Sequence, residues 1–304
     1  MKVLVTGGAG FIGRHVVEHF QEHAQVCVID NLRSGSKQNL DELQCELILG
    51  SILDRDLVRK AVNGVDYVFH LAAMTSVPES IERPTECAEI NSAGTLLLLE
   101  EAARAEAKKF VFSSSAAIYG DSPAIPKKEN TPAEPKSPYA SSKLEGERHC
   151  NRFSDEERLQ TVCLRYFNVF GSYQNPGSQY AAAVPSFIQS AIKNRPINIF
   201  GDGLQTRDFI YVKDVVAANS FFATEPSLKG IFNVASGRRI SINDLAATIC
   251  RLTNSSSEIL HAPERPGDVR HSVADVEKIR EAGFAPTHKF EKGLAETIDF
   301  FRNK

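Results

Sequence analysis

Short apolar runs alternate with helical patterns through the first half of the chain, and this alternation restricts the possible folds more than any other feature. Each run is a near-continuous stretch rich in β-branched residues, which suits a parallel strand that is covered on both faces. We expect strands at 3–6, 26–30, 47–49, 67–71, 110–113 and 162–165, and helices at 12–20, 54–62, 84–105 and 139–153. Repeated β-α-β units of these lengths predict an α/β fold with a doubly wound parallel sheet of the Rossmann type.

The second half carries shorter and less regular elements, so we predict two domains. A nucleotide-binding Rossmann domain takes residues 1–165, and a smaller α+β substrate domain takes 166–304, with some segments returning to pack on the first. Ser241 can cap a helix through a Ser-x-x-Asp pattern, and Gly283 can close a helix that begins near residue 275. The other predicted elements are helices at 185–194, 213–224 and 290–301, strands at 197–200 and 209–212, and a loop at 122–138.

The composition of the 304-residue chain argues against several functional classes. A formal net charge of −3 without a basic run argues against a nucleic-acid surface, and no stretch reaches the roughly 18–20 apolar residues of a membrane span. The six cysteines show no metal-like spacing and the N-terminus enters a strand at once, so we expect a cytoplasmic protein with reduced thiols.

His15, His19 and His23 recur every four residues without an accompanying carboxylate or thiol pattern. We expect histidines at the rim of the first helix there rather than a metal site.

The first predicted strand runs directly into a Gly-Gly-Ala-Gly-Phe-Ile-Gly turn, which is typical of dinucleotide sites. Gly7 permits a tight turn, Gly10 lets the backbone approach a pyrophosphate, and Gly13 allows close packing of helix on strand. The phosphates would lie at a helix start, where free N–H groups favour anions. Asp30, at the end of the second strand, can accept from both ribose hydroxyls and repels a 2′-phosphate, so NAD is favoured; Arg33 is the nearby residue that would support NADP. A purely structural turn is the alternative interpretation.

Tyr139 and Lys143 stand four residues apart, so they share one face of the predicted helix. A free phenol, with a pKa of about 10, is a poor base at neutral pH, but a close ammonium and a positively charged nicotinamide both favour the phenolate. Lys143 can also bond the nicotinamide ribose, and Ser115, at the end of a preceding strand, can hold a substrate oxygen. The set predicts chemistry on an alcohol or ketone; the alternative is a chance Tyr-x-x-x-Lys pair on a solvated helix.

These motifs, in this order, resemble those of the extended short-chain dehydrogenases/reductases, and most closely the UDP-glucose (UDP-galactose) 4-epimerase family of nucleotide-sugar epimerases. The resemblance extends over essentially the whole chain. Besides the glycine turn and the Tyr-Lys pair, it rests on Asp30-Asn31-Leu32, His70-Leu71-Ala72-Ala73, Asn91-Ser92-Ala93-Gly94-Thr95, Ser113–Gly120, Leu164-Arg165-Tyr166-Phe167-Asn168, Thr206-Arg207-Asp208-Phe209 and Arg265-Pro266-Gly267-Asp268.

The resemblance implies site residues by position. To the glycines, Asp30, Tyr139 and Lys143 it adds as NAD contacts Phe11, Ile12, Asn31, Leu32, Ser34, Gly35, Ser51, Ile52, Leu71, Ala72, Ala73, Asn91, Ser113, Tyr166 and Phe167. It assigns to the nucleotide sugar Thr75, Ser115, Tyr139, Asn168, Ala183, Val184, Asn198, Ile199, Phe200, Arg207, Arg265, Asp268 and Ser272. The two arginines suit a diphosphate, since guanidinium forks bind its oxygens in pairs. Ser51 replaces the aspartate that the family usually carries beside the adenine, which bears on the affinity for NAD and not on its identity.

Within this resemblance, enzymes that remove water or a carboxylate carry an acid at the positions of Ala116 or Ala117, where this chain has two methyl groups. Epimerisation at C4 of a UDP-hexose is therefore implied: Tyr139 removes the hydroxyl proton while a hydride passes to NAD, and the 4-keto sugar turns over and takes it back. Ser272 falls on the wall near C2 of the sugar, where a small residue admits an N-acetyl group. UDP-glucose, UDP-galactose and their N-acetyl counterparts are the expected substrates.

Three other functions stay open on the sequence. Two are enzymes, a UDP-glucuronate 4-epimerase and a 4-keto-sugar reductase; the third is a catalytically silent NAD-binding sensor, although such proteins typically lose the tyrosine or the lysine. His70 ends a strand near the expected nicotinamide, and there we expect hydrogen bonding in the sheet rather than catalysis. Helices at 84–105 and 139–153 would form a four-helix contact between subunits, as in the family, so a homodimer is expected.

Overall fold

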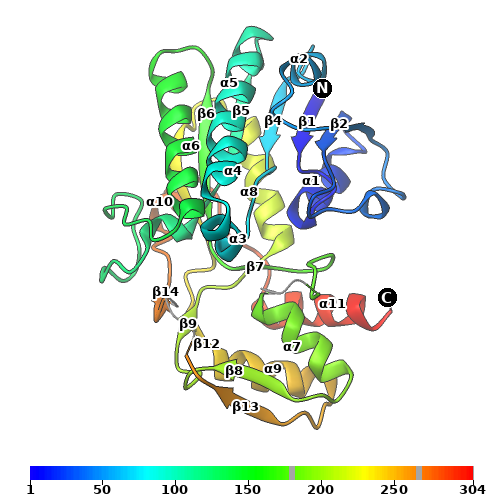
Figure 1. Cartoon of the computed structure of the whole chain (residues 1–304), viewed down its shortest axis with the longest axis vertical. Coiled ribbons are helices and arrows are strands. Elements are labelled where there is room, and N and C mark those ends of the chain that lie inside the picture. Colours follow the sequence, from blue (N-terminus) through cyan, green and yellow to red (C-terminus); the bar gives the residue numbers. More distant parts are fainter. Residues whose placement is uncertain (178–181, 265–268, 304) are drawn as a thin grey trace. The chain divides into compact units, whose positions relative to one another are not determined.

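The structure is a computed structural model that describes residues 1–177, 182–264 and 269–303. The chain divides into two compact units (Figure 1). Unit 1 comprises Met1–Ser122, Pro132–Tyr166 and Val216–Asn233; unit 2 comprises Pro123–Thr131, Phe167–Val215 and Val234–Lys304. The predicted doubly wound parallel sheet is confirmed and lies in unit 1.

Seven strands form this sheet, in the order β11-β6-β5-β4-β1-β2-β3. Their bounds are Lys2–Thr6 (β1), Gln25–Asp30 (β2), Glu46–Leu49 (β3), Tyr67–His70 (β4), Lys109–Ser115 (β5), Thr161–Tyr166 (β6) and Gly230–Val234 (β11). Because β1 pairs in parallel with both β2 and β4, the order of the strands reverses between β1 and β4. Sheets of this kind bind ligands outside the carboxyl ends of the strands at such a reversal.

All six strands predicted in the first half of the chain are present. Val3, Leu4 and Val5 of the central strand β1 have no exposed surface, as expected for parallel strands covered by helices on both faces. At the edge of the sheet, β3 is less covered, and its Leu49 is 64% exposed. The seventh strand, β11, was not predicted. It comes from the less regular second half of the chain and completes the edge beside β6.

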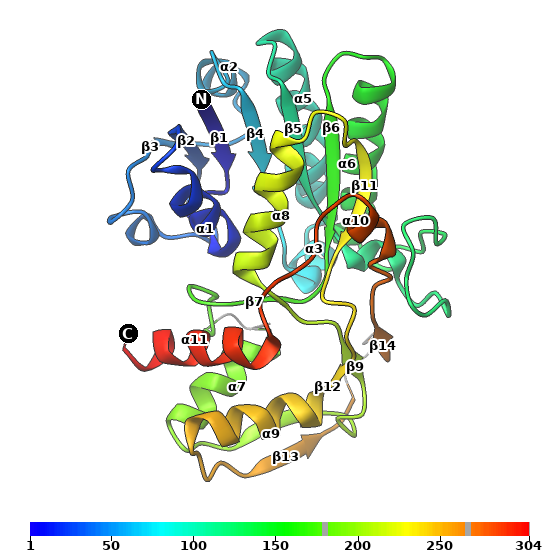
Figure 2. The same ribbon diagram turned by 180° about the vertical axis from the view of Figure 1, so that it is seen from behind.

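Helices cover both faces of this sheet. Their bounds are Phe11–Phe20 (α1), Arg55–Ala61 (α2), Val77–Glu82 (α3), Pro84–Ala88 (α4), Gly94–Arg104 (α5), Pro138–Asp155 (α6) and Val212–Thr224 (α8). Figure 1 shows α5 and α6 in front of the strands, and Figure 2, from behind, shows α8 there. A hydrogen bond of 3.0 Å between His19 and Ser220 joins α1 to α8.

The single helix predicted at 84–105 is interrupted. A π-helical turn, Glu89–Ala93, separates α4 from α5. In its middle, the side chain of Asn91 accepts from the backbone N of Met74 at 2.8 Å and donates to its carbonyl oxygen at 3.0 Å. This contact joins residues 17 positions apart, so no local pattern reveals the interruption.

Short strands and packed helices build unit 2. The helices are Ala183–Ile192 (α7), Ile242–Thr253 (α9), Glu277–Glu281 (α10) and Phe290–Arg302 (α11), and α7, α9 and α11 contact one another (Figure 2). The strand pairs are β8 (Ile197–Phe200) with β13 (Ile259–Ala262), β7 (Val169–Phe170) with β10 (Ile210–Tyr211), and β9 (Thr206–Arg207) with both β12 (Ile240–Ser241) and β14 (His271–Ser272).

Two predicted helix boundaries in unit 2 are confirmed. The hydroxyl of Ser241 accepts from the backbone N of Asp244 at 3.0 Å and caps α9. Gly283 follows α10 with a φ of 96°, in the left-handed region that closes helices. The strand predicted at 209–212 is shorter than expected, because Val212 already begins α8.

All six cysteines are free thiols, and four of them are buried. Across the described ranges, no helix has both the length and the apolar character required to cross a bilayer.

Candidate active site

The glycine turn links β1 to α1 and leaves no room for side chains. Gly7 has a φ of 73°, and a Cβ placed on it would lie 2.7 Å from the backbone N of Ala72. A Cβ on Gly13 would lie 2.1 Å from the carbonyl oxygen of Gly7. Both positions therefore require glycine, because a side chain at Gly7 would collide with the segment after β4 and one at Gly13 with the turn itself. A tight glycine turn at the carboxyl end of β1 fits the place of a pyrophosphate in such sheets.

Asp30 ends β2 and supports this turn. It is 7% exposed, and its carboxylate accepts from the backbone N of Ala9 at 2.9 Å and of Leu32 at 2.8 Å. Each oxygen keeps a further lone pair, which a ribose hydroxyl can use. The loop of residues 31–36 folds back over the turn, since the backbone N of Ser36 donates to the carbonyl oxygen of Ala9 at 3.1 Å. Together these residues fit the ribose and pyrophosphate of a dinucleotide such as NAD.

The segments after β3 and β4 extend the same edge of the sheet. The backbone N of Leu71 donates to the carbonyl oxygen of Thr6 at 3.1 Å, and that of Ala72 to the Thr6 hydroxyl at 3.3 Å. After β3, the hydroxyl of Ser51 accepts from the backbone N of Leu53 at 3.2 Å. The remaining predicted NAD residues on this edge are Phe11 and Ile12 at the start of α1, Asn31, Leu32, Ser34 and Gly35 in the loop, Ile52 after β3 and Ala73 after β4.

Tyr139 and Lys143 lie on the first two turns of α6, as the spacing predicts. The helix start is fixed by Ser137, whose hydroxyl accepts from the backbone N of Ala140 at 3.1 Å. Lys143 is 3% exposed, and its ammonium donates to the carbonyl oxygen of Ser113, in β5, at 2.8 Å. Burial lowers the pKa of Lys143 to about 8.

Burial acts in the opposite direction on the phenol. It raises the pKa of Tyr139 above the usual value, and a hydrogen bond with the side chain of Ser115 opposes this rise. The sequence led us to expect a phenol pKa lowered by the nearby ammonium; in the protein itself, desolvation is the larger influence. Ser115 ends β5, so the carboxyl end of this strand and the first turn of α6 bring the three predicted catalytic residues into one site.

A second set of residues supports the tyrosine, and this supporting role was not predicted from the sequence. The backbone N of Tyr139 donates to the hydroxyl of Ser80, on α3, at 3.2 Å. The amide of Asn91 donates to the hydroxyl of Ser142 at 3.0 Å. Asn91, predicted to contact NAD, therefore directs its side chain into contacts that hold α6 beside the π-helical turn.

Glu147 was also missed, although its spacing was informative. It continues the series Tyr139, Lys143 at intervals of four residues and so shares their face of α6. Its carboxylate binds Arg165, on β6, at 2.7 and 2.8 Å, and accepts from the hydroxyl of Ser114 at 2.6 Å. This fully buried ion pair fixes the rotation of α6 on the sheet.

The structure gives His70 the structural role that the sequence favoured. Its ring is hydrogen-bonded to the hydroxyls of Thr6 and Thr95 at 2.7 and 2.8 Å, and burial lowers its pKa to about 3.

Two of the predicted NAD residues contact each other, since the hydroxyl of Ser113 donates to that of Tyr166 at 3.2 Å. Phe167 begins unit 2 and is buried.

The predicted sugar residues, apart from Thr75, Ser115 and Tyr139, belong to unit 2. Arg207 on β9 stands directly opposite Ser272 on the parallel strand β14, so the structure brings these two together. The others are Asn168 before β7, Ala183 and Val184 at the start of α7, and Asn198, Ile199 and Phe200 on β8. Arg265 and Asp268 lie outside the described residues.

Asp208, next to Arg207, organises this part of unit 2. Its buried carboxylate accepts from the backbone N and the hydroxyl of Ser236 at 2.9 and 2.7 Å, from the backbone N of Gly237 at 3.0 Å and from that of Ala274 at 3.2 Å. Four donors on one carboxylate fix the loop after β9 against the segments that follow β11 and β14.

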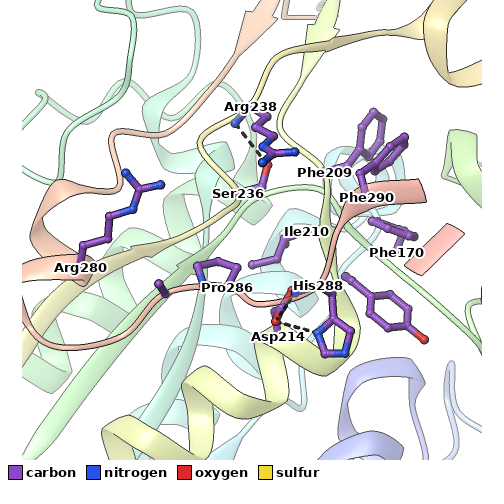
Figure 3. A pocket seen from close by; sticks show the side chains of 12 residues that line it. Phe170, Phe209, Ile210, Asp214, Ser236, Arg238, Arg280, Pro286, His288 and Phe290 are labelled. Atoms are coloured by element: carbon purple, nitrogen blue, oxygen red, sulfur yellow. Dashed lines mark hydrogen bonds and ion pairs between the residues drawn. The ribbon is translucent and has the colours of Figure 1, made fainter. Parts of the chain in front are cut away.

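A small cavity of about 110 Å³ lies within unit 2 (Figure 3). Aromatic side chains, including Phe170, Phe209 and Phe290, form one side of it, and His288 is hydrogen-bonded to Asp214 at its edge. None of the predicted site residues lines it, so this cavity is not the predicted sugar site.

The comparison with known families agrees with this geometry. Residues 3–235 match the profile of the family described as the NAD dependent epimerase/dehydratase family. Over 304 residues the chain is 35% identical to a putative UDP-glucose 4-epimerase of Methanocaldococcus jannaschii, which covers 99% of this chain and 98% of that protein.

Two solved structures are similar over nearly their whole length. One is a UDP-N-acetylglucosamine 4-epimerase from Methanobrevibacter ruminantium in complex with UDP-N-acetylmuramic acid, at 40% identity and a TM-score of 0.96, covering 99% of this chain and 98% of that one. The other is a UDP-glucose 4-epimerase from Thermotoga maritima with UDP-glucose, at 38% identity and a TM-score of 0.95, covering 100% and 99%.

Proposed function

The chain belongs to the NAD-dependent epimerase/dehydratase family, with NAD as its cofactor, and we propose that it inverts carbon 4 of a UDP-hexose. The observation that carries this proposal is the grouping of Ser115, Tyr139 and Lys143 at the carboxyl edge of the sheet that also carries the glycine turn. Neither of the two residues after Ser115 is an acid.

The glycine turn and Asp30 would hold the pyrophosphate and the adenosine ribose. When bound, NAD supplies a reversible acceptor for the hydrogen on the sugar carbon. Tyr139 takes the proton of the 4-hydroxyl and later returns it, while Ser115 hydrogen-bonds the same oxygen. Lys143, fixed by the carbonyl of Ser113, favours the phenolate with its positive charge and thereby counteracts the cost of burying it.

The residues after Ser115 favour epimerisation over the dehydration that the family name also covers. Ala116 and Ala117 begin a short 3₁₀ helix, and the backbone N of Ala117 donates to the Ser115 hydroxyl at 3.1 Å. Loss of water from the sugar needs a further acid and base, which two methyl groups do not supply. Inversion at C4 needs one group that removes and restores a single proton, and Tyr139 is sufficient for it.

We also propose that N-acetylated and unacetylated UDP-hexoses are both substrates. Ser272 leaves room for an N-acetyl group on the wall near C2, and its strand partner Arg207 would bind the diphosphate beside it. One similar structure is named for UDP-N-acetylglucosamine and another for UDP-glucose, which supports a site that accepts either size.

Incubating the purified protein with UDP-galactose or UDP-N-acetylgalactosamine, without added coenzyme, tests both parts. We expect the corresponding gluco-sugars to form until equilibrium. Turnover of UDP-galactose alone would contradict the wider specificity. No conversion of either sugar, together with stoichiometric consumption of NADPH when a UDP-4-keto-hexose is supplied, would indicate a 4-keto-sugar reductase instead.

We further propose a cytoplasmic homodimer. In unit 1, α5 and α6 lie side by side (Figure 1). The same two helices of a second copy would pack against them and complete a four-helix contact between subunits. Light scattering should then give twice the 33.4 kDa mass of the chain; the monomer mass at micromolar concentration would contradict this.

A further inference from the structure

Arg33 is held by two glutamates. In the loop of residues 31–36, its guanidinium bonds Glu79 of α3 at 2.7 Å and Glu86 of α4 at 2.5 Å, through different nitrogens. We call these three residues the Arg33 clamp. Both ends of the guanidinium fork are thus occupied by carboxylates of the protein.

The clamp stands beside the proposed ribose site. Arg33 follows Asp30 by three residues, and successive turns fix the loop between them: the Asp30 carboxylate accepts from the backbone N of Leu32, and the Asn31 side chain accepts from that of Arg33 at 3.1 Å. A 2′-phosphate on the adenosine ribose would lie near Asp30, at the end of β2 from which this loop begins.

The chemistry of Arg33 suits a phosphate better than a hydroxyl. A guanidinium fork binds two phosphate oxygens at once, and an arginine near the end of the second strand is the usual means of accommodating NADP. The clamp removes this capacity because each carboxylate holds one of the two terminal nitrogens of the guanidinium, which a phosphate would need. The side chains of Arg33, Glu79 and Glu86 are 28%, 35% and 37% exposed, so the guanidinium has space to turn if it is released.

We propose that Glu79 and Glu86 are cofactor-specificity residues, which occupy Arg33 and so reserve the site for NAD. The inference rests on the NAD site described above and not on the sugar reaction. It explains how the chain carries an arginine suited to NADP in a family that uses NAD. The sequence alone showed the conflict between Asp30 and Arg33, and the clamp resolves it.

The test is a comparison of dissociation constants for NAD and NADP, measured by calorimetry on nucleotide-free protein. We compare the wild type with the double variant Glu79→Gln, Glu86→Gln. The matched control is Glu82→Gln, Glu89→Gln, which removes the same charge from the same stretch of chain at residues that do not contact Arg33 in the described structure. We expect the first variant to bind NADP about 10-fold more tightly, as one released charge-assisted contact would give, with NAD affinity nearly unchanged.

A triple variant that adds Arg33→Met separates release of the arginine from loss of repulsion. The gain in NADP affinity should disappear in it. A gain that persists without Arg33, or a Glu79→Gln, Glu86→Gln variant that matches the control, would overturn the proposal. Because the measurement is of binding, failure of the epimerase assay would leave it intact, and failure here would leave the epimerase proposal intact.

Discussion

The proposed catalytic residues of unit 1 and the proposed sugar residues of unit 2 are held in different ways. Lys143 is almost fully buried, and one turn further along α6 Glu147 forms a buried ion pair with Arg165. Arg207 and Ser272 are only partly buried and stand on strands of two residues each. A change at Lys143 or Glu147 would break buried polar contacts, whereas Arg207 and Ser272 can be replaced with little loss of burial. We infer that unit 1 sets the reaction and unit 2 sets which sugar enters.

The largest effect should come from Tyr139→Phe, which removes the one group assigned to the proton of the 4-hydroxyl. We expect turnover of UDP-galactose to fall by about 10³- to 10⁴-fold, the upper range for loss of a general acid–base group. The control is Tyr67→Phe. Tyr67 begins β4 and so lies at the end of the strand away from the proposed site, and this variant should retain full turnover. More than a tenth of wild-type turnover in the Tyr139 variant would break the catalytic assignment.

The buried ion pair should matter for stability far more than an exposed one. Glu147→Ala removes the carboxylate that compensates the buried charge of Arg165, and we expect the free energy of unfolding in urea to fall by about 3–5 kcal/mol. Asp202→Ala removes one of two carboxylates that pair with the exposed Arg270 in unit 2 and should change the urea midpoint little, because solvent screens such pairs. Equal losses of stability in the Glu147 and Asp202 variants would contradict the proposed difference between the two units.

A substitution in unit 2 should change specificity without changing the chemistry. Ser272→Tyr places a ring on the wall near C2, and we expect kcat/KM for UDP-N-acetylgalactosamine to fall about 100-fold, the scale of a few lost contacts and one steric conflict. The kcat/KM for UDP-galactose should stay within about twofold of the wild-type value. Ser272→Ala is the control and should keep both substrates. An equal loss on both sugars would place Ser272 in general folding or catalysis.

The smallest effect concerns pH. The folded pKa of Lys143, about 8, lies below its unfolded value, so above pH 8 the unfolded chain holds a proton that the folded chain has lost. Stability contributed by this group therefore rises with pH, by about 2 kcal/mol between pH 7 and pH 9.5. The measurement is the urea stability of the wild type relative to Lys143→Met over that range; a flat difference would show that the ammonium is not desolvated.

The sequence predicted the parts of the molecule that local patterns encode. The strands of the first half are continuous apolar runs, the glycine turn is contiguous, and Tyr139 and Lys143 are one helical turn apart, so each could be recognised from neighbours in the chain. The order of these motifs then led to the fold and the family.

The parts that were missed depend on residues far apart in the sequence. Strand β11 joins the sheet from position 230, and the π-helical turn follows from the bonds of Asn91 to Met74. The Arg33 clamp joins residues 46 and 53 positions apart. Two-residue strands such as β9 and β14 are too short to carry a hydrophobic period, so their pairing, which sets Ser272 opposite Arg207, had no sequence signal.

The most direct test of the account follows the hydrogen on carbon 4 of the sugar. UDP-galactose deuterated at C4 is incubated with the protein in ordinary water, without added coenzyme, and the UDP-glucose formed is analysed by mass spectrometry and NMR. We expect the product to keep its deuterium at C4, because the hydrogen that NAD would accept from C4 is the one that returns to it. Replacement of that deuterium by hydrogen from water would contradict it.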